Sequence, residues 1–75
     1  MWREEDNQLK RDFEFANFID AFAFLSKVAI LAEKHNHHPY IFNVYNKVSL
    51  GLNTHDAGDI VTQKDRDLAA AIDQL

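Results

Sequence analysis

The chain has 75 residues, 47% of them hydrophobic, and a formal net charge of −4 at pH 7. This length allows one small core, hence a single domain over residues 1–75, and a domain of this size buries about 60% of its unfolded surface. The absence of cysteine excludes disulfides, thiolate zinc sites and cysteine nucleophiles, and we expect a reducing compartment, the cytoplasm. Acidic and basic residues are interspersed, so we expect no direct binding to nucleic acid.

No segment has the composition of a signal sequence or a membrane span. Residues 1–6 are charged rather than apolar, unlike the start of a secretory signal. Asp20, Ser26 and Lys27 interrupt the longest apolar stretches, which therefore fall short of the roughly 20 residues that span a bilayer. We expect a soluble protein with no membrane partner.

Residues 9–15 alternate between apolar and polar side chains, which is the period of a half-buried strand. The residues on the apolar side are Leu9, Arg11, Phe13 and Phe15. Asp6 and Asn7, just before this segment, favour a turn. We therefore expect residues 2–5 to form a short partner strand in a hairpin.

Residues 17–34 have the period of an α-helix, and Asn17 is the predicted N-cap. One apolar row consists of Phe18, Phe22, Leu25, Ala29 and Ala32, and a second consists of Ala21, Phe24, Val28 and Leu31. At about 100° per residue the two rows cover about half of the helix, which is more than one small sheet covers. We therefore expect the helix to pack on its own sheet through one row and on another copy of the chain through the other.

The long helix should end near residues 33–34, because Pro39 forces the residue before it out of helical space. A second hairpin is expected to follow. Its strands are predicted over residues 41–45 and 47–54, with a tight turn at Asn46, alone or with the residue after it.

The last third predicts a loop over residues 55–59 and then a short helix. Thr62 and, three residues later, Asp65 have the pattern of an N-cap and an acidic N3 residue. The apolar side of this helix is expected to contain Leu68, Ile72 and Leu75. The order strand, strand, helix, strand, strand, helix favours a two-layer α+β domain, with one four-stranded antiparallel sheet and both helices on one face.

All four histidines lie between positions 35 and 55, in predicted loops and loop edges. A solvated polar loop would account for them without any site. However, His37 and His38 precede the second hairpin and His55 follows it, and the two ends of a hairpin are adjacent. We therefore expect these three side chains to lie toward the same end of the sheet.

Clustered imidazoles suit either a metal site or acid/base catalysis. His37 and His38 point to opposite faces if the segment is extended, so both cannot easily reach one ion. His35, His37 and His55 could form a ligand set, but their spacing matches no established zinc pattern. Acid/base catalysis is the better use, because a pKa near about 6.5 lets one ring donate and another accept a proton at neutral pH. We expect no metal.

From residue 33 onward the sequence resembles the signature of the pterin-4a-carbinolamine dehydratases. The resemblance rests on the string Glu33-x-x-x-His37-His38-Pro39, the segment 42–48 with Tyr45, Thr54-His55 and Asp65. The aromatic and alanine pattern of residues 13–29 is also similar to the family. The resemblance therefore covers essentially the whole chain.

This resemblance implies a hydro-lyase reaction in tetrahydrobiopterin recycling, the dehydration of a 4a-hydroxytetrahydropterin to the quinonoid dihydropterin, without a cofactor. It also implies that His37 and His55 are the acid/base pair and that His38 binds and polarises the pterin. The further pterin-binding residues that it implies are Glu33, Asn36, Pro39, Tyr40, Asn53, Thr54, Lys64 and Asp65. The family is similar to a dimerisation cofactor of a homeodomain transcription factor. We therefore expect a homodimer or homotetramer, and the alternative function is a non-enzymatic interaction module and coactivator.

Three positions depart from the usual pattern of the family. Asn36 stands where an acidic residue is common, Ile41 where a tryptophan is common, and Lys64 where an arginine is common. Without the ring at position 41 pterin stacking should loosen, and lysine keeps the charge of arginine but not its planar fork. The chain also begins about where a further helix of the family would end. Because the three histidines are retained, we expect altered affinity or substrate preference rather than loss of activity.

Overall fold

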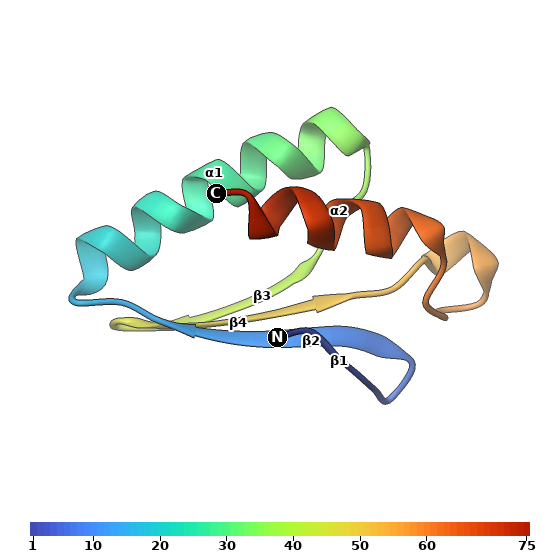
Figure 1. Ribbon diagram of the computed structural model, residues 1–75, viewed down its shortest axis with the longest axis horizontal. Helices are drawn as coiled ribbons and strands as arrows, with labels where there is room; N and C mark the ends of the chain where they lie inside the picture. The colour runs from blue at the N-terminus through green and yellow to red at the C-terminus, as the bar shows by residue number, and fades with distance from the viewer.

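The computed structural model describes all residues, 1–75, as a sheet covered by two helices (Figure 1). The strands are β1 (Arg3–Glu5), β2 (Gln8–Glu14), β3 (Tyr40–Val44) and β4 (Lys47–Leu52), and the helices are α1 (Phe18–His35) and α2 (Gln63–Asp73). The strands form one antiparallel sheet in the order β1-β2-β4-β3. Both helices lie on the same face (Figure 1), which confirms the predicted two-layer α+β fold.

The central pair of strands, β2 and β4, joins the two hairpins. Leu9 lies opposite Leu52, and Phe13 lies opposite Val48. These side chains belong to the hydrophobic core or pack against it, because the period of two turns them to the helix-covered face. The remaining strands, β1 and β3, form the edges of the sheet.

The turn of the second hairpin lies one residue earlier than predicted. Its residues are Tyr45 and Asn46, and Lys47 already belongs to β4. The Nδ2 atom of Asn43 donates to the backbone oxygens of Tyr45 and Lys47 at 3.2 and 2.8 Å, and Nδ2 of Asn46 donates to the oxygen of Phe15 at 2.8 Å. These bonds accompany a φ of 51° at Tyr45, which is uncommon for a bulky residue. Pattern alone therefore placed the turn too late.

Helix α1 begins and ends with defined caps. The Oδ1 atom of Asn17 accepts from the backbone N–H of Asp20 at 2.8 Å, which confirms the predicted N-cap. The helix ends at His35, and Asn36 at φ 49° is a left-handed C-cap whose N–H bonds to carbonyl groups of the last turn. The backbone N–H of His37 donates to the carbonyl of Ala32, one of the two that the Asn36 N–H also bonds. The caps therefore determine where the chain leaves the helix.

The buried stripe of α1 takes members from both predicted apolar rows, so the prediction that one whole row faces the sheet is wrong. The buried residues are Ala21, Leu25, Val28 and Ala32, with Phe24 and Leu31 partly buried beside them. Their spacing, i, i+4, i+7 and i+11, runs between the two rows. The large apolar residues of α1 left exposed are Phe18, Ile19, Phe22 and Ile30. As predicted, the apolar arc is wider than the part that the core covers.

Helix α2 completes the core. Thr62 is its N-cap and Asp65 its N3 residue in a capping box, as the sequence predicted. Leu68 and Ile72 are 0% and 2% exposed. Leu75, expected on the same side, lies beyond the last helical residue and is 48% exposed, because the helix stops two residues before the chain does. Neither helix has the length and apolar character of a transmembrane span.

Candidate active site

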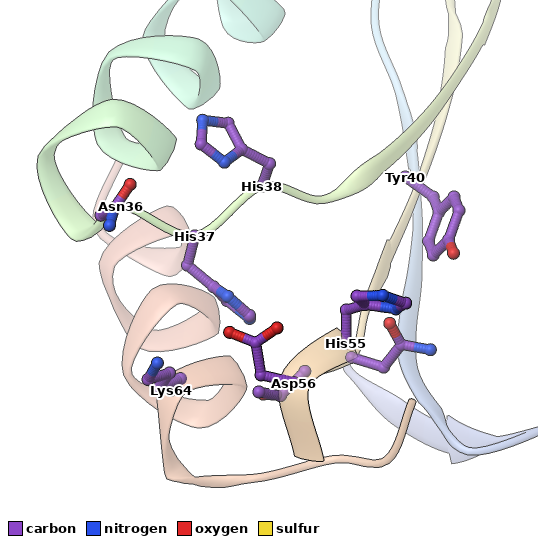
Figure 2. Close-up of a pocket in the computed structure, with 9 residues that line it drawn as sticks. Asn36, His37, His38, Tyr40, His55, Asp56 and Lys64 are labelled. Atoms are coloured by element: carbon purple, nitrogen blue, oxygen red, sulfur yellow. The ribbon is translucent and has the colours of Figure 1, made fainter. Parts of the chain in front are cut away.

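A polar pocket of about 340 Å³ lies at the end of the sheet where β3 begins and β4 ends. Pockets of this volume hold small molecules. Its lining residues are Asn36, His37, His38, Tyr40, Asn53, Thr54, His55, Asp56 and Lys64. They come from the end of α1, the start of β3, the segment after β4 and the first turn of α2 (Figure 2).

The pairing of β3 with β4 brings the three histidines to this pocket. Tyr40 lies opposite Gly51, so the segment that enters β3 and the segment that leaves β4 run at the same end of the sheet. His37 and His38 lie on the first segment. His55 begins one turn of 3₁₀ helix, His55–Ala57, on the second. The loop predicted for residues 55–59 thus contains a short helical turn, and all three histidines are lining residues of one pocket.

His37 is held by a buried carboxylate. Its Nε2 atom lies 2.5 Å from Oδ1 of Asp65, and the two side chains are 11% and 0% exposed. The other carboxylate oxygen, Oδ2, accepts from the Thr54 hydroxyl at 2.9 Å and from the Thr62 N–H at 2.8 Å. One edge of the ring is therefore tied to the start of α2.

His38 forms a more exposed pair with Glu33, from the last turn of α1. Its Nε2 atom lies 2.5 Å from Oε2 of Glu33, and the side chains are 60% and 78% exposed. Figure 2 shows the His38 ring turned toward the end of α1 and away from His55. Because water screens a pair this exposed, the His38–Glu33 pair orients the ring but contributes little to the stability of the fold.

His55 is paired with Asp59, four residues later. The His55 Nδ1 atom lies 2.9 Å from Oδ1 of Asp59. Gly58 and Asp59, both at positive φ, turn the chain back so that the carboxylate reaches the ring. This hydrogen bond, then the negative charges of Asp59 and Asp56, raise the pKa of His55 above its ordinary 6.5. More of the ring is therefore protonated near neutral pH, which suits a general acid.

Replacing Asp59 with asparagine is expected to lower the pKa of His55 toward its ordinary value. The substitution removes the hydrogen bond to a carboxylate, and it removes the negative charge that has the larger effect on this pKa. An NMR titration of the His55 ring proton measures this change. Asp56→Asn is the matched control: Asp56 acts on the ring through its charge alone, so the decrease should be smaller. An equal or larger decrease in the Asp56 variant would contradict the assignment.

Three of the residues implied in pterin binding do not line the pocket: Glu33, Pro39 and Asp65. Glu33 and Asp65 contact histidine rings instead. Conversely, Asp56 lines the pocket and Asp59 bonds to a pocket histidine, although neither was predicted as a site residue. The sequence signal available for Asp59, on which no prediction rested, is its spacing of four residues from His55.

The alternative metal site has no ligand set in the structure. No group of three or more histidine, aspartate and glutamate side chains is arranged to hold an ion. His35, the third member of the alternative set, is exposed and does not line the pocket.

Taken together, fold and pocket define the class, a small α+β domain with a histidine-lined pocket at one end of its sheet. The family profile described as pterin 4 alpha carbinolamine dehydratase matches residues 1–75. The chain therefore belongs to the pterin-4a-carbinolamine dehydratase family, as the motif resemblance predicted.

Cyanobacterial relatives are similar over nearly the whole chain. A Prochlorococcus marinus (strain MIT 9312) protein, provisionally named a pterin-4-alpha-carbinolamine dehydratase, is 50% identical over 74 residues, which are 99% of this chain and 76% of the relative. A Picosynechococcus relative with the same provisional name is 51% identical, over 99% of this chain and 79% of its own length.

Two solved structures have the same fold. One, a transcriptional coactivator/pterin dehydratase from Brucella melitensis, superposes with a TM-score of 0.91 at 37% identity, over 97% of this chain and 79% of the other. The second, a pterin dehydratase-like protein identified as a RuBisCO assembly factor in the alpha-carboxysome, has a TM-score of 0.81 at 29% identity, over 97% and 86% of the two chains. The fold is therefore shared by proteins with different named roles.

Proposed function

We propose that the protein dehydrates a 4a-hydroxytetrahydropterin to the quinonoid dihydropterin, a recycling step of tetrahydropterin metabolism in the cytoplasm. The observation that carries this proposal is that His37 and His55 line one pocket and that each ring is bound to a different carboxylate. Membership of the dehydratase family supports the substrate class. The proposed reaction uses no metal and no organic cofactor.

The chemistry requires one proton to be delivered and another to be removed. A carbinolamine carries a hydroxyl and an amine nitrogen on the same carbon, so loss of water breaks the C–O bond and forms a C=N bond. His55, whose pKa is raised by Asp59, protonates the departing hydroxyl, which leaves as water. His37 accepts the proton from the ring nitrogen. Proton exchange with solvent then restores both rings.

The other pocket residues bind the flat heterocycle. The side chains that line the pocket beside the acid/base pair include Asn36, Tyr40, Asn53, Thr54 and Lys64, which offer amide, hydroxyl, aromatic and ammonium groups. His38, oriented by Glu33, polarises the pterin from the α1 side. Pro39 and Asp65 lie outside the lining, and Asp65 holds the His37 ring.

The direct test measures the dehydration of a chemically prepared 4a-hydroxytetrahydropterin against the uncatalysed rate. We expect the quinonoid product to form at a rate that increases in proportion to protein concentration. A rate that does not respond to the protein, at concentrations where pterin binding saturates, would contradict the proposal.

The proposal includes assembly into a homodimer or homotetramer. The large apolar residues exposed on α1 and β3 are Phe18, Ile19, Phe22, Ile30, Tyr40, Ile41, Phe42 and Val44. Surfaces rich in exposed large apolar side chains often mark sites of protein association. In addition, β3 is an edge strand, and an unpaired strand edge favours pairing with another chain. A second copy of the chain would cover both surfaces.

Phe22→Lys is expected to shift the assembly toward the monomer, because a charge replaces a side chain that is 54% exposed on α1. Analytical ultracentrifugation over a range of protein concentrations measures the shift. The control is Gln74→Lys, which adds the same charge at an exposed position beyond the end of α2 and should leave the assembly unchanged. A wild-type chain that sediments as a monomer at every concentration would refute this part of the proposal.

The same exposed apolar residues favour a second candidate function, a non-enzymatic interaction module. This role agrees with the coactivator and assembly-factor names of the two similar structures. The two functions are distinguished by combining the turnover assay with a binding assay. An interaction module would retain a protein partner through α1 and β3 and show no turnover, and its partner binding would be insensitive to His37→Ala.

A further inference from the structure

We infer that Asp65 is a positioning residue, which holds His37 in the tautomer protonated at Nε2 and so leaves Nδ1 as the nitrogen that faces the substrate. This inference rests on the proposed function, in which His37 accepts a proton. It assigns the ring atom that does so and the group that selects it.

The hydrogen-bond pattern around Asp65 determines the direction of its bond to His37. A carboxylate accepts hydrogen bonds and donates none. The Oδ2 atom accepts from the Thr54 hydroxyl and the Thr62 N–H, and Oδ1 lies 2.5 Å from Nε2 of His37. Nε2 must therefore carry a hydrogen. In the neutral ring, Nδ1 then has a free lone pair and can act as a base.

The other ring nitrogen, Nδ1, is accessible. The His37 side chain makes its hydrogen bond through Nε2. Every buried side-chain nitrogen and oxygen in the structure has a hydrogen-bond partner. Nδ1, which has no protein partner, is therefore not buried. Because His37 lines the pocket, Nδ1 is the atom that a bound carbinolamine can reach.

Helix α2 keeps the Asp65 carboxylate in place. Asp65 is the N3 residue of the capping box, so its bond to the N–H of Thr62 is part of the start of the helix. The Thr54 hydroxyl donates to Asp65 and therefore accepts from the Thr62 hydroxyl, 2.6 Å away. The carboxylate is thus bound both by the segment after β4 and by the start of α2, and it cannot turn away from His37 without breaking the helix cap.

Asp65→Asn tests this role with a small change in shape. The amide oxygen can still accept from Thr54 and Thr62, and the amide nitrogen then faces Nε2 of His37 as a donor. The ring is therefore expected to switch to the tautomer protonated at Nδ1. In the serine protease triad an equivalent Asp→Asn change lowers kcat by about 10⁴-fold through the wrong tautomer.

The tautomer is read from the ¹⁵N shifts of the His37 ring in long-range ¹H–¹⁵N spectra, at an alkaline pH where imidazole is neutral. We expect Nε2 to be protonated in the wild-type protein and Nδ1 in Asp65→Asn. A wild-type ring protonated at Nδ1, or the same tautomer in both proteins, would overturn the inference. If the variant does not fold, the wild-type spectrum still decides the tautomer.

Kinetics separate positioning from a general loss of structure. Because Asp65 does not line the pocket, Asp65→Asn should lower kcat by about 10²–10⁴-fold with a smaller change in KM. The control is Asp67→Asn on the same helix, where the carboxylate is exposed and accepts from Gln63; it should change neither tautomer nor kcat. A folded Asp65→Asn protein with wild-type kcat would refute the positioning role. The tautomer is measured without substrate, so this inference can be confirmed or refuted independently of the dehydratase activity.

Discussion

Replacing His37 or His55 with alanine is expected to lower the kcat of pterin dehydration by about 10²–10⁴-fold, the usual contribution of one general acid or base. The two rings line one pocket and have different carboxylate partners, so neither ring can replace the other. The double variant should be little slower than the slower single variant, because residues that act in one step are not additive. Steady-state kinetics on 4a-hydroxytetrahydropterin provide the measurement.

The control for this experiment is His35→Ala. His35 is exposed and does not line the pocket, so its loss should leave kcat unchanged. Circular dichroism of each variant shows whether the fold is retained, which matters most for His37, whose removal leaves a buried carboxylate without one of its donors. Wild-type turnover in folded His37→Ala and His55→Ala proteins would exclude histidine acid/base catalysis and leave only the family and fold assignments.

The elements that the sequence predicted well are those with local signals. Asn17 and Thr62 are N-caps that bond within one turn of their own helices, so nearby residues suffice to recognise them. The second hairpin turn has local bonds from Asn43 and also a bond from Asn46 to Phe15, 31 residues away, which the alternation of side chains does not reveal. The buried stripe of α1 likewise depends on how the helix lies on the sheet, which its periodicity alone does not determine.

The sequence likewise predicted only part of the candidate site. The approach of His55 to the two earlier histidines follows from hairpin topology, because paired strands end together. Their carboxylate partners do not follow from topology. Asp59 reaches His55 only because residues 58 and 59 adopt positive φ angles, and Asp65 reaches His37 only because α2 packs beside the end of α1. Sequence pattern identified Asp65 as a helix cap and the family resemblance implied that it binds the pterin, but neither revealed its bond to His37.

The second large expected effect concerns stability, and the chain offers a matched pair to measure it. Ile72→Ala should lower the free energy of unfolding by about 2–5 kcal/mol, because it leaves a cavity at a side chain that is 2% exposed in the core. For a domain of this size each kcal/mol lowers Tm by about 4–8 °C. Since small domains have total stabilities of about 5–15 kcal/mol, thermal and urea unfolding should show a large loss.

Ile19→Ala makes the same chemical change on α1, where the side chain is 78% exposed. In a monomer its effect should stay within about 0.5 kcal/mol, since a surface substitution leaves no cavity. If a second copy covers this face, the effect instead grows with protein concentration, because assembly then contributes to stability. Unfolding both variants at low and high protein concentration thus distinguishes the stability that comes from the core of one chain from the stability that comes from contact between two chains. Equal losses at both positions in dilute protein would contradict the burial pattern on which the fold, and with it the pocket, depends.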